Sequence, residues 1–406
     1  CKMAKDNNND KNGEMIFLVE DDSKGKHSRK KNKDRKKLYR IISLLFTIGF
    51  FIFAALFVYE VWILPMRIDK SIEKAQGLYN IQTDGEPVEG HEEGIVENTS
   101  TTEDKENQVI EDTYFDPNRD QYGRLIEFKD LLDINEDVKG FIMIPNTNIE
   151  LPVVQSSNGD PEYYLARGWD REPIKSGSLF LDNRSSVEDK SKNLVIHGHN
   201  MKSTNNMFHH LLRYKDINFL KENPVFTFDT IYDKGEWKIF AYIITNGSNR
   251  KEEFFDYQKS TFKDDFDFMN FIYKLRIRSV YNIDSVDINE NDQIITLSTC
   301  SYELNDYRTL IVARKVREGE DSTVEPDGIS HNPKPLYPET FHNHYGVSVP
   351  DLPETFEEAL EEGIVTWYKP TAESVEETIE ILSHEQEDEP FEKPLRYNLK
   401  NRLDIK

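Results

Sequence analysis

An uncharged apolar run, residues 41–59, is the feature that most constrains what this chain can fold into. The run is long enough to cross the hydrocarbon core of a membrane, roughly 30 Å thick, as one helix. Lysines and arginines crowd the segment before it, from Lys24 to Arg40. The positive-inside rule then predicts an uncleaved single-pass anchor, a transmembrane helix over 41–64 in the cell membrane, with the N-terminus in the cytoplasm. A cleaved signal peptide is the competing interpretation, which the length of the run and the lack of a small-residue cleavage site disfavour.

The formal net charge of -24 is distributed unevenly along the chain. Residues 1–40 form a basic cytoplasmic segment in this interpretation, and the neighbouring span favours contact with anionic lipid over nucleic acid. Residues 65–112 are predicted to be an acidic extracellular stalk, because Asp84 to Asp112 contains too few apolar residues to bury a core.

The next region, residues 113–317, contains many short strand candidates separated by turn signals. These candidates are 141–144, 151–155, 178–181, 194–197, 225–229, 237–244, 294–299 and 309–316. Such a succession makes the fold mainly β and is typical of a barrel or a sandwich. A helix is predicted over about 124–134. A second helical stripe, formed by Phe262, Phe266, Met269 and Tyr273, is interpreted as core packing.

Cys300 stands where the strand candidate 294–299 meets a loop, and the chain has only two cysteines. A lone cysteine more often behaves as a small buried hydrophobe, so this alternative stays open. Two features favour a nucleophile: Arg308 can return beside the sulfur in a hairpin, and His199 follows an earlier strand. A thiol with a separate histidine and a cation is the minimum set for nucleophilic acyl transfer. A free thiol outside the cell also risks oxidation unless it has a use.

These segments resemble the sortases, most closely the class B sortases. TLSTC ending at Cys300, with Arg308 after it, resembles the cysteine and arginine strands of the family. VIHGHNM, Val195 to Met201, resembles its histidine loop, with His197 where the family usually has tyrosine. The resemblance covers about 113–317. It implies a closed eight-stranded β-barrel with an N-terminal helix and a helix in the connection before the cysteine strand.

The resemblance also implies a cysteine transpeptidase that needs no cofactor. Cys300 is the expected nucleophile, which forms a thioacyl intermediate, with His199 as the proton carrier and Arg308 as the stabiliser of the oxyanion. Ser298 and Thr299 are expected to bind substrate. This assigns 113–317 as an extracellular catalytic domain.

The implied substrate is the C-terminal sorting signal of secreted surface proteins. The implied acceptor is an amine of the cell wall. A peptidoglycan amine is the preferred acceptor, and a pilin lysine, as in pilin-polymerising sortases, is the alternative. Both acceptors would use the same residues of this chain, so the sequence does not separate the two.

Two other classes of function are compatible with parts of the sequence. Imidazoles at the spacing of His197, His199, His209 and His210 can bind zinc, but no carboxylate motif such as HExxH accompanies them, so no metal site is predicted. A catalytically inactive, membrane-tethered binding module is the other class.

In such a binding module, the segment that recruits partners would be the acidic, proline-interrupted C-terminal extension, residues 318–406. We interpret the extension by default as a solvated tail, with a partner-docking segment or a lid over the groove as alternatives. Two short helices with capping boxes are predicted within it, one after Thr355 and one after Ser374.

Overall fold

The computed structural model of the chain describes residues 23–83, 116–250 and 252–371. The chain divides into two compact units, Cys1–Met66 and Arg67–Lys406.

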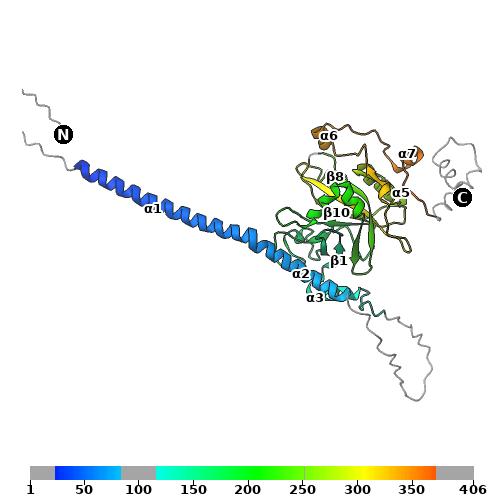
Figure 1. Cartoon of the computed structure of the whole chain (residues 1–406), viewed down its shortest axis with the longest axis horizontal. Coiled ribbons are helices and arrows are strands. Elements are labelled where there is room, and N and C mark those ends of the chain that lie inside the picture. Colours follow the sequence, from blue (N-terminus) through cyan, green and yellow to red (C-terminus); the bar gives the residue numbers. More distant parts are fainter. Residues whose placement is uncertain (1–22, 84–115, 251, 372–406) are drawn as a thin grey trace, which may run out of the picture. The chain divides into compact units, whose positions relative to one another are not determined.

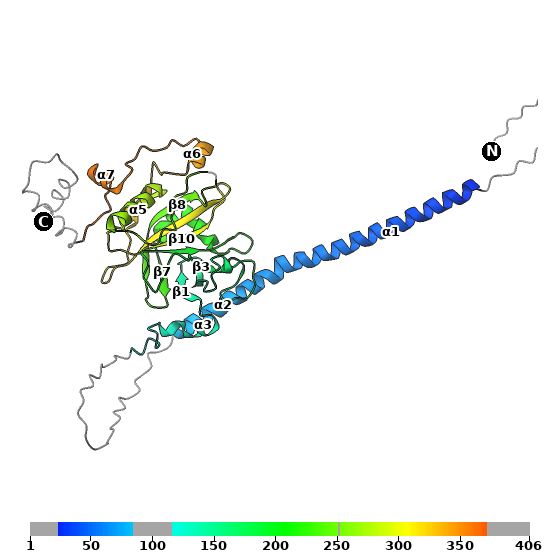
Figure 2. The same cartoon turned by 180° about the vertical axis from the view of Figure 1, so that it is seen from behind.

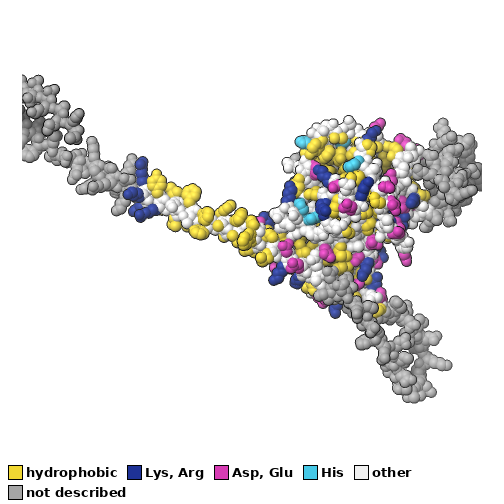
Figure 3. All heavy atoms as spheres, viewed as in Figure 1, with side chains coloured by type: hydrophobic (Ala, Val, Ile, Leu, Met, Phe, Trp, Pro, Cys, Tyr) yellow, Lys and Arg dark blue, Asp and Glu magenta, His cyan; other side chains and the backbone are white. Residues whose placement is uncertain are grey.

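The described part of the first unit is helical. Helix α1 (Ser23–Val58) is followed by one turn of π-helix (Tyr59–Ile63). Among the described residues, one helix is long and apolar enough to cross a membrane, and its most apolar window is fully exposed. Figure 3 shows apolar side chains along α1, with lysine and arginine side chains where its described side chains begin. The apolar N-terminal helix is therefore confirmed, while its insertion in a membrane stays a prediction.

The second unit is built on a closed eight-stranded barrel, as the resemblance implied. Its strand order is β1-β2-β3-β4-β10-β11-β8-β7, and β7 closes the barrel by pairing with β1. The strands are β1 (Val138–Met143), β2 (Glu150–Val154), β3 (Leu179–Leu181), β4 (Asn193–His197), β7 (Val225–Thr230), β8 (Glu236–Asn246), β10 (Ile294–Cys300) and β11 (Tyr307–Lys315). Each of the eight predicted strand segments falls on one of them.

The central strands of the barrel are buried on both faces. Six of the seven residues of β10 are buried, and β8 is buried along nearly its whole length. Strand β4 runs parallel to β10. Both strands are nearly continuous apolar runs, as is typical of parallel strands that are buried on both faces. A short hairpin of β5 (Asn200–Met201) and β6 (Asn206–Met207) follows β4. This places the HGHNM segment next to the end of β10.

Short helices surround the barrel. The predicted helix over 124–134 is a 3₁₀ turn (Ile126–Phe128) continued by α3 (Lys129–Ile134). Further 3₁₀ turns span Tyr163–Ala166, Phe208–Lys215 and Pro326–Gly328, and α4 is Ile217–Glu222.

The helix in the connection before the cysteine strand is α5 (Asp265–Arg278). Its N-terminus is capped by Asp264, whose carboxylate accepts a hydrogen bond from the Asp267 N–H. Met269 and Tyr273 are buried as predicted. The prediction is wrong for Phe266, which is 48% exposed, because the buried face of α5 is centred on residues such as Phe268 and Ile272 instead.

The predicted stalk differs from the structure over its first part. Helix α2 (Leu64–Thr83) has an apolar face at helical spacing, and its Ile68, Ala75 and Tyr79 are buried. The Tyr79 ring stacks on Phe141 of β1, with ring centroids 4.2 Å apart, and its hydroxyl donates to Asp229 at 2.6 Å. Residues 67–83 are therefore part of the barrel unit. Residues 84–112 of the predicted stalk lie outside the described residues.

The C-terminal extension, treated by default as a solvated tail, is folded onto the barrel unit from 318 to 371. Strand β12 (Ile329–His331) pairs with β9 (Tyr281–Ile283), and α6 (Glu339–Tyr345) and α7 (Phe356–Glu361) follow. The default was wrong there because the extension buries apolar side chains; these are Val324, Ile329, Phe341, Phe356, Ala359, Val365 and Trp367. The predicted capping box of Thr355 and Glu358 is confirmed. The helix predicted after Ser374 lies outside the described residues.

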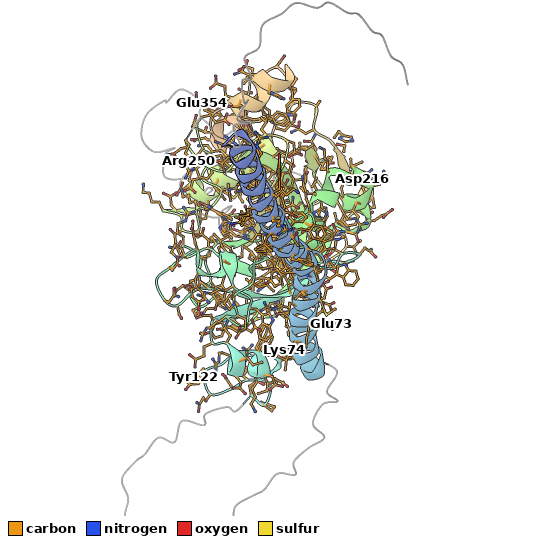
Figure 4. All side chains as sticks on the ribbon, turned by 90° about the vertical axis from the view of Figure 1, so that its left-hand side faces the viewer. Glu73, Lys74, Tyr122, Asp216, Arg250 and Glu354 are labelled. Atoms are coloured by element: carbon orange, nitrogen blue, oxygen red, sulfur yellow. The ribbon has the colours of Figure 1, made fainter. Side chains whose placement is uncertain are left out.

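The extension and α2 lie at opposite ends of the barrel unit. Both views show α7 beside α5, and α2 beside α3 at the other end (Figures 1 and 2). In Figure 4, Glu354 and Arg250 lie at the upper end, away from Glu73 and Lys74 of α2.

Candidate active site

Cys300 and Arg308 are direct cross-strand partners. Cys300 ends β10, Arg308 lies near the start of β11, and the antiparallel register places them opposite each other. The loop between them is closed by the Ser301 N–H, which donates to the Tyr307 carbonyl at 2.9 Å. Cys300 is a free, partly exposed thiol. The hairpin predicted from sequence is therefore present, and it places Cys300 and Arg308 opposite each other on neighbouring strands.

Three contacts position the Arg308 guanidinium. Its Nη1 donates to the Tyr307 carbonyl at 3.1 Å and lies 3.4 Å from a carboxylate oxygen of Asp306. A Cβ atom added at Gly247 would lie 2.7 Å from Arg308 Cζ, so the guanidinium packs directly against that glycine. The side chain keeps 26% of its surface exposed and so presents a fixed charge toward solvent.

His199 reaches the same strand end through the parallel pairing of β4 and β10. The register pairs His197 with Ser298, and the Gly198 N–H extends it by donating to the Ser298 carbonyl at 3.1 Å. His199 Nε2 lies 2.9 Å from the Leu165 carbonyl. Because a carbonyl can only accept, this contact assigns the proton to Nε2 and leaves Nδ1 as the nitrogen that can take or give a proton.

Asn200 is a site residue that the sequence reasoning did not assign. Its side-chain amide donates to the Cys300 carbonyl at 2.9 Å, and its amide oxygen accepts from His209 Nδ1 at 2.7 Å. The hydroxyl of Tyr302 donates to the Asn200 carbonyl at 3.2 Å. Asn200 thus joins the histidine loop to the residue that carries the thiol. Its place directly after His199 in the HGHNM segment was the available signal.

The two predicted substrate-binding residues lie beneath the surface. Ser298 and Thr299 are each 2% exposed. The Ser298 hydroxyl is 3.1 Å from that of Tyr257, and Thr299 Oγ1 donates to the Gly198 carbonyl at 2.9 Å. Both hydroxyls therefore bond within the protein, and their contact with substrate stays a prediction.

The four histidines are dispersed among different partners. His197 Nε2 donates to Asp182 at 3.0 Å. Burial opposes ionisation of Asp182, but hydrogen bonds from His197 and Arg184 outweigh it and lower the pKa of this carboxyl to about 2. Burial lowers the pKa of His209 and His210. In the part of the chain that the structure describes, no group of three or more His, Cys, Asp or Glu side chains is arranged to hold a metal ion.

Several known proteins that are similar to this chain are sortases. A family model described as a sortase domain matches residues 142–316. Sortase B of Listeria monocytogenes is 36% identical over 177 residues, which cover 44% of this chain and 68% of that relative. Sortase B of Staphylococcus aureus is 30% identical over 194 residues, which cover 47% of this chain and 75% of that relative. The solved structure of sortase B from Listeria monocytogenes is 34% identical, with a TM-score of 0.40, and the match covers 46% of this chain and 99% of that one.

The identity and coverage of these curated relatives show that the chain belongs to the sortase family, in its class B branch. It is a sortase-type cysteine transpeptidase, an enzyme of cell-wall sorting.

Proposed function

We propose that Cys300, His199 and Arg308 are the catalytic residues, and that they cut the C-terminal sorting signal of secreted proteins and transfer the protein to an amine of the cell wall. One observation carries the proposal. The Cys300–Arg308 register pair and the β4–β10 pairing, which leads to His199, support it because they bring these three residues toward one strand end. Catalytic groups held on strand ends stay fixed while the adjoining loops leave them open to substrate.

In the first half-reaction, the Cys300 thiolate adds to the carbonyl carbon of the scissile peptide bond, and the carbonyl electrons move to oxygen. Arg308 stabilises that oxyanion, because its guanidinium stays charged and is held in place before substrate binds. When the C–N bond breaks, His199 gives a proton to the leaving amine. The product is a thioester on Cys300 and a free C-terminal peptide.

In the second half-reaction, the acceptor amine adds to the thioester. His199 takes a proton from that amine, the C–S bond breaks, and the Cys300 thiolate leaves. The Leu165 carbonyl supports both proton transfers, because it holds the Nε2 proton and fixes the ring while Nδ1 changes its protonation. Water in place of the amine would give hydrolysis.

A peptide library tests this function. Full-length protein in detergent is incubated with LPxTG-like and NPxTN-like peptides, and intact-protein mass spectrometry follows the mass added at Cys300. We expect an adduct whose added mass equals that of the N-terminal peptide fragment less one water, released by hydroxylamine and absent in Cys300→Ala. Absence of any adduct over the whole library would contradict the proposal.

We also propose the membrane topology predicted from the sequence. Residues 1–40 are cytoplasmic, 41–64 cross the cell membrane, and the catalytic domain lies outside with the folded part of the extension. The apolar helix and its basic flank support this orientation. A membrane-impermeant maleimide added to intact cells should label the wild type and not Cys300→Ala. Equal labelling of the wild type and Cys300→Ala in intact cells would come from Cys1 and would reverse the orientation.

A further inference from the structure

The C-terminal extension meets the loop that joins Cys300 to Arg308. Phe341 of α6 is 9% exposed, and its ring stacks with Tyr307 at a centroid distance of 6.3 Å and with Tyr337 at 4.1 Å. Tyr307 directly precedes Arg308 and is only 2% exposed. An aromatic stack of the extension therefore covers the residue next to the catalytic cation.

Glu252, in the connection between β8 and α5, fastens this contact. One of its carboxylate oxygens accepts from the Tyr307 hydroxyl at 3.1 Å, and the other accepts from the Thr340 N–H of α6 at 2.7 Å. Burial and the Glu252 carboxylate raise the pKa of Tyr307 well above its ordinary value, so this hydroxyl stays a donor. The single carboxylate thus ties α6 to the first residue of β11.

A second contact holds the middle of the same loop. The Tyr345 hydroxyl at the end of α6 donates to the Glu303 carbonyl at 3.2 Å. The Glu303 carboxylate lies 3.3 Å from the Lys215 ammonium on the other side. The loop is therefore held by α6 both at Glu303 and at Tyr307.

Tyr307 passes this restraint on to Arg308. Its carbonyl accepts from the Ser301 N–H at 2.9 Å and from Arg308 Nη1 at 3.1 Å, so its position fixes both the loop closure and the guanidinium. We propose that α6, with Tyr337 before it, is a positioning element for Arg308 that the extension supplies to the catalytic barrel. Phe341 and Tyr345 act through Tyr307 and the loop and touch no reacting atom. The inference rests on the proposed role of Arg308.

The position of a stabilising group matters more to the transition state than to binding, so loosening α6 should lower kcat more than it raises KM. The thiol itself depends on β10 and Asn200 rather than on α6. Alkylation of Cys300 by iodoacetamide should therefore be unaffected.

The test compares two aromatic residues of the extension in the full-length enzyme. Phe341→Ala removes the aromatic stack over Tyr307. Phe356→Ala removes a similarly buried ring of α7; the main-chain N–H of Phe356 donates to Asn270 of α5, away from the site. We expect kcat/KM to fall about tenfold in Phe341→Ala, mostly in kcat, with unchanged alkylation, and to change less than about twofold in Phe356→Ala. Phe341→Tyr should restore most of the activity. Tyr345→Phe keeps the packing and should lose about two- to threefold, which decides the matter if Phe341→Ala fails to fold.

A combined variant separates this inference from the proposed function. In an Arg308→Lys background, Phe341→Ala should add less than about twofold, because the cation that α6 positions is already altered. Fully additive losses of kcat/KM in the combined variant would overturn the positioning role of α6. Equal losses of kcat/KM in Phe341→Ala and Phe356→Ala would do the same. Either result would leave the proposed transpeptidase function intact. If the wild type forms no adduct at Cys300 with any peptide, the proposed function fails first.

Discussion

The two sides of Cys300 are built in different ways. On the histidine side, β4 runs parallel to β10, and buried contacts within the barrel, such as that of Thr299 with Gly198, set the position of His199. On the arginine side, Arg308 depends on a hairpin loop, on the connection after β8 and on α6 of the extension. The contacts described for the histidine side thus come from residues before the extension, while the arginine side also depends on the extension itself.

The partners on the two sides also differ in charge. On the histidine side, His199 and the Cys300 carbonyl bond to neutral groups, the Leu165 carbonyl and the Asn200 amide, while the Asp182 carboxylate contacts His197. Carboxylates of Asp306, Glu252 and Glu303 surround the arginine side. Neutral hydrogen bonds fix the geometry of His199, whereas the partly exposed cation Arg308 is held by charged neighbours whose effect salt weakens.

The largest expected effect is at Arg308. Arg308→Lys keeps the charge but loses the planar fork that lies against Gly247, so kcat/KM should fall about 100-fold. Arg184→Lys on the histidine side is the matched control, since Arg184 pairs with Asp182 and Asp256 and touches no proposed catalytic group. Peptide-cleavage kinetics should show less than a twofold change there. Equal losses in the two variants would remove the distinction between the sides.

On the histidine side, Asn200→Ala should cost about tenfold in kcat/KM. The substitution leaves the Cys300 carbonyl without its amide donor and the His209 ring without its acceptor, and it should lower the free energy of unfolding by about 1–3 kcal/mol. Asn206→Ala is the control, because Asn206 is equally buried but donates to Asp69 of α2. Urea unfolding and kinetics together separate the two: both variants should lose stability, and only Asn200→Ala should lose activity.

Much of the barrel could be predicted from the sequence because its signals are local. Each strand is a short apolar run between turns, and the Cys300, His199 and Arg308 segments lie at strand ends. Asn200 was missed because its contacts with Cys300 and His209 depend on the register between strands β4 and β10. The Leu165 carbonyl was missed because a main-chain acceptor has no signature in the sequence.

The extension and α2 were misjudged for a related reason. Phe341, Phe356 and Trp367 are sparse among prolines and acidic residues, so the window around each one resembles a solvated tail. Their burial depends on surfaces of α5 and β11 that come from distant parts of the chain. Likewise, Ile68 and Tyr79 of α2 are buried only because the barrel offers them a face.

A smaller effect is expected at Gly247, which tests how tightly the arginine side is packed. Gly247→Ala places a methyl group 2.7 Å from Arg308 Cζ, and the flexible end of that side chain can move away. Stability should change little, while kcat/KM falls about fivefold as the guanidinium shifts. Gly235→Ala, whose new methyl would lie 3.1 Å from Lys315 Cε, is a control away from the site. Unchanged kinetics in Gly247→Ala would mean that the arginine side tolerates displacement.

Asp182 should have the smallest effect on activity, below about twofold, and a clear effect on stability. Its pKa is about 2 in the folded protein and 3.8 as an ordinary carboxyl, so the ionised form stabilises the fold above pH 4 and that contribution is lost as the pH falls toward 2. The pKa shift of Asp182 corresponds to a contribution of about 2 kcal/mol to the free energy of unfolding at neutral pH, and about half of that contribution remains at pH 3. Asp182→Asn should therefore differ from the wild type by about 2 kcal/mol in urea unfolding at pH 6, and by about half as much at pH 3. A difference that is the same at both pH values would show that the His197–Asp182 contact stabilises the histidine side through its shape and not through its charge.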